Sequence, residues 1–328
     1  AAYISTFDLQ HGFWQAALDP KTAHRTAFTC EYGTFQYKVV PMGLLSSAQF
    51  FQSFVETKLD RHGILYRKVH ERSDATNTYI DEDGVRCRGF CGAYVDDLVI
   101  FSKDAQDHKR DLSRLLEVLS HEHLYLNVAK SHLFCKYVRF LGCVCGQNKI
   151  YMDGDKISAI LDMPEPKSTQ SEVRSFLGAV GFYRKWISNY SEIASPLVEL
   201  LKGKEKKITP GLWTARQSDA VYHLKQAITK YPVLRQFDQR KAIFVVTDAS
   251  DYAIGGCLFQ YHGEPPAPCA VQYISRAMIP AERNYDVREK ECLAIKYVLG
   301  KLRHYLLATT FTVKCLSDHR SLSSVSYT

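Results

Sequence analysis

The sequence predicts an α+β region followed by a smaller α/β domain. In residues 1–152, β-prone segments alternate with a stretch of helical periodicity, amphipathic helices dominate the middle of the chain, and a β-β-β-α-β order comes after them. The 328 residues suffice for about two or three domains. Hydrophobic residues make up 46% and charged residues 23% of the chain, which excludes disorder, collagen and coiled coil as descriptions of the whole.

Composition also indicates partners and compartment. Lys and Arg number 42 and Asp and Glu 35, and the net charge of +7 favours a polyanionic partner such as nucleic acid. No apolar run approaches the roughly 20 residues of a membrane helix. Residues 1–8 lack signal-peptide features and have the composition of a strand interior, so we expect the chain to start inside a domain. The ten cysteines lack zinc-finger spacing and are typical of reduced, mostly buried thiols of an intracellular protein.

The first region carries an acidic residue at the end of a strand. Residues 3–9 are β-prone, with Asp8 near the end of the run. A second β-rich stretch, 26–40, is broken by a turn at 32–34, which predicts a hairpin. Apolar residues then recur at helical spacing and predict a helix from about Ser47. Taken alone, Asp8 is most often a cap or a turn former.

Residues 93–101 carry two adjacent aspartates, Asp96 and Asp97, between apolar β-formers. The pattern predicts a hairpin of two buried strands with both carboxylates at the bend, although Asp also favours turns for conformational reasons alone. Two like charges in an apolar hairpin raise at least one pKa unless a cation lies there, and Mg²⁺ is a cation that prefers oxygen ligands. If Asp8 folds beside them, three carboxylates can hold two metals for phosphoryl transfer.

Several short motifs follow one another in the order of the reverse transcriptase palm motifs. They are Phe7-Asp8-Leu9, Gly12-Phe13, Met42-Gly43-Leu44 with Phe51-Gln52, Tyr94-Val95-Asp96-Asp97, Leu126-Asn127 with Lys130, and Phe140-Leu141-Gly142. The chain therefore resembles the reverse transcriptase of gypsy-like (Metaviridae) LTR retrotransposons over essentially its whole length. The resemblance implies a palm over residues 1–152 with truncated fingers. It also marks residues 61–89, which include Asp81-Glu82-Asp83-Gly84, as an unusual insert.

The resemblance implies roles for the residues of the first motifs. Asp8, Asp96 and Asp97 would be the catalytic residues that bind metal, and Leu9 would offer its backbone carbonyl to the metal. Phe13 lies where the family has an aromatic steric gate, which leaves no space for the 2′-OH that distinguishes RNA precursors from DNA precursors. Core packing is the alternative role for Phe13.

Other motif residues would contact substrate. Gly43 would let the backbone approach the nascent base pair because it has no Cβ, and Gln52 would support that wall. Tyr94 would touch the primer end. Lys130 would contact the incoming phosphates, with an ordinary solvated lysine as the alternative. The sequence departs from the family at 46–48, where Ser-Ser-Ala replaces Asn-Ala-Pro.

A helical connector is predicted after the Pro-Glu-Pro boundary at 164–166. Thr169 and Glu172 have capping-box spacing, and apolar residues follow at i, i+3, i+4 and i+7. Further helices are expected near 196–201 and 220–228, on either side of a basic loop. Its cations suit a thumb that grips the backbone of a duplex, whereas a solvated charged face is the alternative. By resemblance, residues 153–238 form the thumb and connection.

The last region has the element order of a ribonuclease H fold. Strands are predicted at 242–248, 255–259, 270–274 and 311–316, with a helix from about Val287 before the last strand. By resemblance, residues 239–328 form a C-terminally truncated RNase H-like domain, and the family's fourth acid is expected beyond the last residue. Asp248, Glu291 and Asp318 would bind two Mg²⁺ ions for hydrolysis of the RNA strand of a hybrid. Glu291 is preferred to Glu289 because the residues that follow it fit the family pattern.

The function implied by the resemblance is RNA-directed DNA synthesis with RNase H activity, by two-metal phosphoryl transfer with Mg²⁺, or alternatively Mn²⁺. The expected partners are an RNA template, a DNA primer, an RNA/DNA hybrid and dNTPs, with protease and integrase in the same parent polyprotein and no membrane. The expected location is intracellular, in a cytoplasmic particle, the nucleus or both. A truncated, catalytically inactive remnant that only binds nucleic acid is the alternative.

Overall fold

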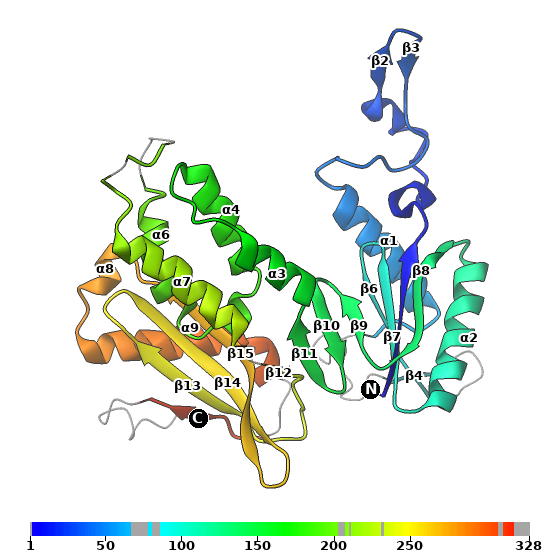
Figure 1. Cartoon of the computed structure of the whole chain (residues 1–328). Helices are drawn as coiled ribbons and strands as arrows, with labels where there is room; N and C mark the ends of the chain where they lie inside the picture. The colour runs from blue at the N-terminus through cyan, green and yellow to red at the C-terminus, as the bar shows by residue number, and fades with distance from the viewer. Residues whose placement is uncertain are drawn as a thin grey trace. The chain divides into compact units, whose positions relative to one another are not determined.

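The structure is a computed structural model in which the described residues are 2–66, 78–80, 86–202, 207–209, 211–230, 233–307 and 311–317. The chain divides into two compact units. The first comprises residues 1–140 and 145–147, and the second comprises residues 141–144 and 148–328. Both units combine helices with β-sheet (Figure 1).

The first unit is built around an antiparallel sheet with strand order β6-β7-β1-β8 (Figure 1). Its strands are β1 (Tyr3–Leu9), β6 (Cys91–Tyr94), β7 (Asp97–Ser102) and β8 (Leu126–Cys135). Two helices, α1 (Ser47–Arg61) and α2 (Ala105–His121), share one apolar core with this sheet. The strand predicted at 3–9 and the helix predicted from about Ser47 are confirmed.

Side chains that alternate between the two faces of this sheet place the apolar residues and the carboxylates on different faces. Phe7 and Leu9 on β1, and Leu98 and Ile100 on β7, belong to the core shared with the helices. Because successive side chains point to opposite faces of a sheet, Asp8 and the other residues of its parity lie on the face away from the helices. The strand pattern thus leaves one face of the sheet for carboxylates.

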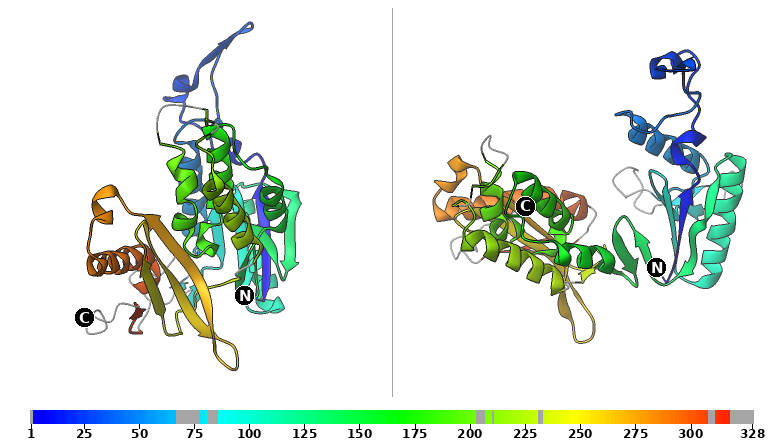
Figure 2. Two further views of the ribbon diagram at one scale, coloured as in Figure 1. Left: turned by 60° about the vertical axis from the view of Figure 1, so that its left-hand side comes forward. Right: turned by 45° about the horizontal axis from the view of Figure 1, so that its top comes forward.

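Shorter elements complete the first unit. They are η1 (Gly12–Gln15), η2 (Ala23–Thr26), β2 (Phe28–Cys30), β3 (Gly33–Phe35), β4 (Thr78–Ile80), β5 (Arg86–Arg88) and β9 (Val138–Phe140). The β2–β3 hairpin confirms the turn predicted at 32–34, and it projects away from the four-stranded sheet (Figure 2). Within the expected insert, β4 pairs with β5 in antiparallel fashion, and the acidic stretch 81–84 lies outside the described residues.

A buried chain of hydrogen bonds fastens α2 to the sheet. The N–H of Phe134 donates to Ser5 Oγ (3.0 Å), which lies 2.7 Å from His108 Nε2. His108 Nδ1 lies 2.9 Å from Ser102 Oγ, which donates to Asp111 Oδ2 (2.7 Å). Since Ser102 gives its one proton to Asp111, the imidazole proton is on Nδ1 and Nε2 accepts from Ser5. Burial lowers the pKa of His108 against the opposing effect of Asp111, which favours this neutral form.

A second buried contact joins the ends of α1 and α2 through Glu122. Its side chain is 5% exposed, and its carboxylate lies 2.8 Å from Lys58 Nζ, 3.2 Å from Arg61 Nη1 and 2.9 Å from His62 Nε2. The hydrogen bond from Lys58, with those from its other partners and the nearby positive charges, lowers the pKa of Glu122 to about 2. The ionised carboxylate is therefore part of the folded unit.

The second unit begins with a helical region. Its elements are β11 (Lys149–Met152), α3 (Gly154–Asp162), α4 (Gln170–Gly181), η4 (Arg184–Trp186), α5 (Tyr190–Ile193), α6 (Ser195–Glu199), α7 (Ala215–Thr229) and β12 (Leu234–Arg235), while β10 (Cys143–Gly146) contributes to both units. The helices predicted after Pro-Glu-Pro are confirmed. Thr169 Oγ1 caps α4 by accepting from Glu172 N, whereas Glu172 Oε2 accepts from Ser168 N rather than from Thr169. Residues 203–206 of the expected basic loop lie outside the described residues.

A mixed sheet with strand order β15-β14-β13-β16 follows. Its elements are β13 (Phe244–Ala249), β14 (Ala253–His262), β15 (Ala267–Ala277), α8 (Pro280–Arg283), α9 (Val287–Leu306) and β16 (Lys314–Leu316). β13 and β16 are parallel and the other pairs are antiparallel, which confirms the predicted β-β-β-α-β order. A Cβ at Gly256 would overlap the carbonyl oxygen of Val246 on β13 and lie 3.0 Å from Val298 Cγ2 on α9, so glycine permits the close approach of both elements.

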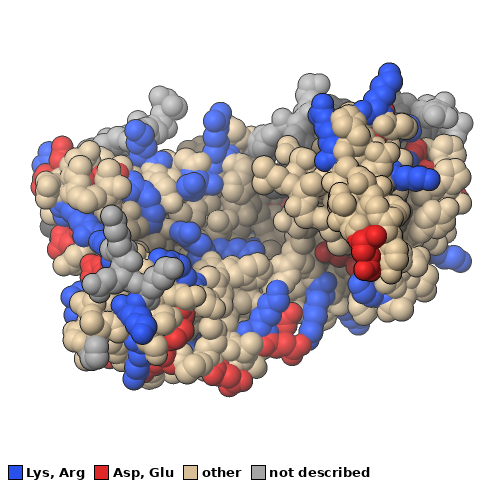
Figure 3. Space-filling view, turned by 90° about the horizontal axis from the view of Figure 1, so that it is seen from above, with Lys and Arg blue, Asp and Glu red and all other residues tan. Residues whose placement is uncertain are grey.

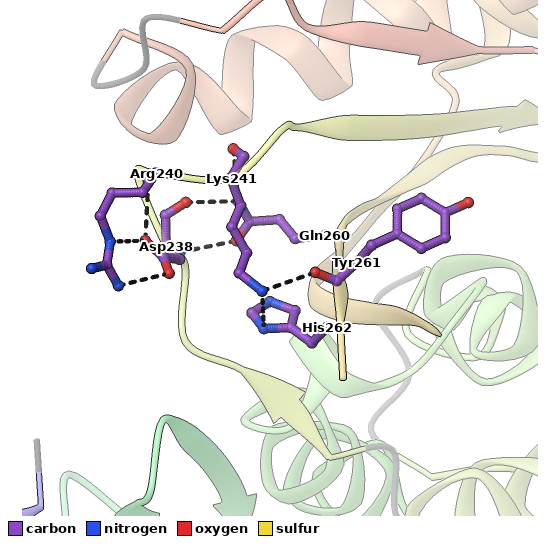
Figure 4. A network of polar contacts seen from close by, with 6 residues as sticks. All are labelled: Asp238, Arg240, Lys241, Gln260, Tyr261 and His262. Carbon is purple, nitrogen blue, oxygen red and sulfur yellow. Dashed lines mark hydrogen bonds and ion pairs between the residues drawn. The ribbon is translucent and has the colours of Figure 1, made fainter. Parts of the chain in front are cut away.

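Polar contacts fix the loop that leads into β13 (Figure 4). Gln260 is fully buried; its Oε1 accepts from Asp238 N (2.9 Å) and its Nε2 donates to the carbonyl oxygens of Asp238 (2.8 Å) and Lys241 (3.3 Å). Lys241 Nζ in turn donates to Tyr261 O (3.1 Å) and lies 3.3 Å from His262 Nδ1. These contacts hold the loop against β14 just before the strand that carries Asp248.

The helical region and the mixed sheet belong to the same compact unit. Arg184 Nη2 donates to the carbonyl oxygen of Ser275 on β15 (2.6 Å). Ser275 Oγ accepts from Ser191 N (3.0 Å) and donates to Ser191 Oγ (3.0 Å). The boundary expected at 238/239 therefore lies within one packed unit.

We predict that Glu122→Gln destabilises the first unit. The pKa of Glu122 is about 2 rather than its usual 4.5, which corresponds to roughly 3 kcal/mol of stability at pH 7. Because this pKa is depressed, the contribution is present above pH 4.5 and is lost as the pH falls toward 2. Hydrogen exchange of the amides in α1 and α2, measured across this pH range, checks both the size and the direction.

Glu117→Gln is the matched control for this prediction. Glu117 forms a surface pair with Arg114 at 3.5 Å, in which both side chains are largely exposed, and such pairs contribute little. Equal effects of the two substitutions, or a loss for Glu122→Gln that does not shrink in acid, would contradict the assignment.

Candidate active site

Three carboxylates converge on the face of the first sheet that the helices leave open. Asp8 lies directly opposite Asp97 in the register of β1 and β7. Asp96 precedes Asp97 in the tight turn between β6 and β7, and its carbonyl oxygen accepts from Leu9 N at 2.9 Å. Lys130 on β8 brings one cation to the cluster, with Nζ 3.5 Å from Asp8 Oδ2. The hairpin predicted from the adjacent aspartates is confirmed.

The carboxylates repel one another. Burial raises the pKa of Asp96, and the charges of Asp8 and Asp97 raise it further, against the opposing effect of Lys130. Burial and Asp8 likewise raise the pKa of Asp97. Moreover, Asp96 Oδ1 is buried without a hydrogen-bond partner. A divalent cation with oxygen preference fits this donor set, because it would both neutralise the charges and satisfy that oxygen.

Gly12 forms a wall of the site. A Cβ at this position would overlap the carboxylate of Asp96. The backbone of η1 therefore packs directly on the catalytic candidate, and only glycine allows that approach.

The turn that carries the two aspartates is strained and clamped. Val95 has φ of 52°, a conformation that a β-branched residue rarely adopts. Gln52 on α1 holds it: its Oε1 accepts from Val95 N (2.5 Å), and its Nε2 donates to Ala93 O (3.1 Å) and to Glu56 Oε1 (2.6 Å). Gln52 thus contacts the aspartate turn itself.

The other residues expected at this site lie in varied surroundings. Phe13 packs against the core with its ring centroid 5.2 Å from that of Phe51. Tyr94 is 55% exposed at the end of β6. Gly43 has φ of 96°, and a Cβ built there would meet nothing within 4 Å.

The second set of acids is brought together only in part. Asp248 is exposed on β13 opposite Gly255. Glu291 is buried on α9, and its Oε2 accepts from Ser317 Oγ at 3.2 Å, just after β16. Asp318 lies outside the described residues. Glu289, the rejected alternative, is exposed and caps α9 by accepting from Asp286 N at 3.1 Å.

Sequence reasoning missed three functional contacts at these sites. They are the approach of Gly12 to Asp96, the clamp on Val95 by Gln52, and the bond from Ser317 to Glu291. The glycine at position 12, three residues after the end of the strand that carries Asp8, was a usable signal for the first. Nothing in the local sequence signals the other two, because their partners come from distant elements.

Comparison with known families decides the relationship. Residues 1–145 match the family model described as reverse transcriptase (RNA-dependent DNA polymerase), and residues 213–313 match the RNase H-like domain found in reverse transcriptase. The chain belongs to the reverse transcriptases with an RNase H-like domain. Within this family it is similar to the Transposon Tf2-3 and Tf2-7 polyproteins of Schizosaccharomyces pombe, each 33% identical over 319 residues. The match covers 97% of the chain and 22% of each polyprotein, so the chain spans about a fifth of these relatives.

Solved reverse transcriptase structures share the fold. The foamy viral protease-reverse transcriptase in complex with an RNA/DNA hybrid matches with a TM-score of 0.76 and 22% identity, over 97% of this chain and 39% of that one. Its complex with dsDNA matches with the same TM-score and identity, over 98% of this chain and 60% of that one. The predicted family and fold class are confirmed. In the described part of the chain, no helix has the length and apolar character needed to cross a membrane.

We predict that Gln52→Ala loosens the aspartate turn of the reverse transcriptase domain. The N–H of Val95 loses its acceptor, so its hydrogen exchange should accelerate, and stability should fall by about 1–2 kcal/mol. Gln49→Ala, at an exposed position of the same helix, should change neither quantity.

The same substitution in a Val95→Gly background separates strain from simple loss of hydrogen bonds. Glycine adopts positive φ freely and stores no strain there, so Gln52→Ala should cost more stability in this background than in the parent chain, where release of the turn recovers the strain at Val95. An equal loss in both backgrounds, measured by urea unfolding, would contradict the clamp on a strained turn.

Proposed function

We propose that this chain is an RNA-directed DNA polymerase whose nucleotidyl transfer takes place at Asp8, Asp96 and Asp97. The observation that carries the proposal is the convergence of these carboxylates around the buried, unpartnered Oδ1 of Asp96. Reverse transcriptases and RNase H-like domains generally use divalent metals, and carboxylate oxygens suit Mg²⁺, with Mn²⁺ as a close alternative.

The three carboxylates would hold the metal, which when bound would stabilise negative charge on the attacking and leaving oxygens. The fold of the chain positions these carboxylates. The β1–β7 register holds Asp8 opposite Asp97, and the turn clamped by Gln52 fixes Asp96 beside them. Since these groups sit on a packed sheet, little reorganisation is needed when substrate arrives.

Lys130 suits the handling of incoming phosphates. Its side chain is 66% exposed, and its Nζ is held 3.5 Å from Asp8, so it can exchange this carboxylate for a phosphate oxygen. Phe13 suits the steric gate because its packing on Phe51 fixes the ring. The open space and positive φ at Gly43 suit close approach of a base pair, and the exposed Tyr94 suits contact with the primer end.

The charge of the chain supports nucleic acid as template, primer and hybrid. Lysine and arginine side chains stand out over a mostly uncharged surface on the face seen in Figure 3, and the net charge is +7. In the second unit, Lys185 Nζ lies 4.3 Å from the ring centroid of Trp186, and Lys156 Nζ lies 5.1 Å from that of Phe182. Cations held in this way suit contacts with phosphate that do not depend on base sequence.

We propose RNase H activity as the second function of the chain, with Asp248, Glu291 and Asp318 as its acids. The supporting observation is that Ser317, the residue before Asp318, bonds to the buried Glu291. The parallel pairing of Val246 with Leu316 also brings the end of β16 toward the strand that carries Asp248.

The parent protein is proposed to be a longer polyprotein that includes protease and integrase, and to act in an intracellular particle or in the nucleus. The support is that the chain spans 22% of the transposon polyproteins to which it is similar.

Primer extension on an RNA template with Mg²⁺ and dNTPs tests the polymerase. We expect Asp96→Asn to lower extension at least about a hundredfold, because removing a carboxylate from a metal site costs several kcal/mol of transition-state stabilisation. Asp219→Asn, at an exposed position of α7, should extend like the parent chain. Extension unaffected by Asp96→Asn would overturn the assignment.

Cleavage of the RNA strand of a labelled RNA/DNA hybrid tests the nuclease separately. Glu291→Gln and Asp248→Asn should each abolish cleavage, since both remove a proposed metal ligand. The matched control Glu289→Gln should retain it, because that side chain caps a helix. Cleavage retained in Asp248→Asn would exclude this site, and salt-sensitive hybrid binding without either activity would instead favour the inactive remnant.

A further inference from the structure

A cluster of metal-ligating side chains lies at the adjoining ends of α1 and α2, apart from the two acidic sites. It consists of His62, His121 and Glu122, whose ligand atoms all lie within 4.8 Å of one another. His62 follows the last residue of α1, His121 is the last residue of α2, and Glu122 comes next. We propose that this cluster binds one zinc-type transition-metal ion and thereby joins the two helix ends.

The separations suit such an ion. Glu122 Oε1 lies 2.9 Å from His62 Nε2 and 3.9 Å from His121 Nδ1. In a tetrahedral site with metal–ligand bonds of about 2.1 Å, neighbouring ligand atoms lie about 3.4 Å apart. The two observed separations lie on either side of that value, and all three ligand atoms lie within 4.8 Å of one another, so side-chain shifts can bring them to tetrahedral spacing.

The donor types select the class of metal. Two imidazoles and one carboxylate are the protein ligands of open zinc sites, where water takes the fourth position. Imidazole nitrogen suits Zn²⁺ and its transition-metal neighbours, whereas Mg²⁺ and Ca²⁺ prefer oxygen throughout. The site is therefore chemically distinct from the carboxylate cluster around Asp96.

Two of the ligand side chains are largely buried and one is exposed. The side chains of Glu122 and His62 are 5% and 19% exposed, whereas that of His121 is 74% exposed. The first two are held by the packing of the helix ends, and His121 can close on an ion that arrives from solvent. The C-terminal ends of two helices also carry partial negative charge that favours a cation.

The cations already present do not compete equally for Glu122. Lys58 Nζ donates to Oε2 at 2.8 Å and to the backbone carbonyl of Glu122 at 2.9 Å, so it does not engage Oε1, the oxygen that lies 2.9 Å from His62 Nε2. Arg61 Nη1 reaches Oε1 at 3.2 Å from a side chain that is 64% exposed. Because the guanidinium of Arg61 can move into solvent, whereas Lys58 is only 19% exposed, a bound ion displaces Arg61 while Lys58 stays in place.

Titration of the full chain with cobalt(II) tests the proposal, because the absorption spectrum of cobalt(II) reports its ligands. We expect one equivalent to bind in tetrahedral geometry without a thiolate charge-transfer band. His121→Asn removes a ligand at an exposed position and should weaken binding at least about tenfold. The matched control is His123→Asn, an exposed histidine outside the cluster whose φ of 53° asparagine tolerates.

Arg61→Gln should act in the opposite direction. It removes the competitor for Glu122 Oε1 and should therefore strengthen cobalt(II) binding several-fold. Unchanged binding in His121→Asn, weaker binding in Arg61→Gln, or a thiolate band at the first equivalent would each overturn the proposal. Strengthening by Arg61→Gln together with loss by His121→Asn would support it independently of either enzymatic activity.

Discussion

The register of β1 and β7 brings like charges together, and the first unit is organised around that constraint. Asp8 lies opposite Asp97, and Asp96 precedes Asp97 in the turn. Like charges placed directly across a strand pair are destabilising, and burial raises the pKa values of Asp96 and Asp97 further. The apolar core beneath the sheet offsets this repulsion, and Lys130 offsets part of it at the site. A bound cation would remove the remaining repulsion. The closeness of the three carboxylates therefore both destabilises the strand pair and favours a metal ion.

The same strands serve packing on one face and chemistry on the other. Ser5 on β1 and Ser102 on β7 face α2 and bond to the buried His108, whereas Asp8 has the opposite parity on β1. Because each hydroxyl in that chain of hydrogen bonds has one proton, the direction of every bond is determined. The sheet that carries the carboxylates is therefore fixed from behind by specific hydrogen bonds as well as by apolar contacts.

β-propensity predicted the strand at 3–9, and apolar residues at helical spacing predicted a helix from about Ser47. Two adjacent aspartates between apolar β-formers predicted the hairpin with both carboxylates at its bend, because Asp favours turns and the flanking residues favour strands. The positive φ of Val95 was not predictable, since valine rarely adopts it and its stabilising partner, Gln52, is 43 residues away. The cluster around Glu122 escaped notice for the same reason, because His62 lies 60 residues before it. The local sequence pattern determines which helices and strands form. Contacts between residues far apart in the sequence determine where the backbone is strained and which side chains gather at a ligand site.

The bonds of Arg184 and Ser191 to Ser275 have a consequence for evolution. Genetic elements exchange segments by recombination, and an exchange preserves function only when its crossover leaves buried contacts intact. A crossover near residue 238 would separate the partners of the buried Ser275, and the incoming sheet would meet a foreign connector. A crossover that keeps these buried contacts would have to transfer the mixed sheet together with the helices that precede it.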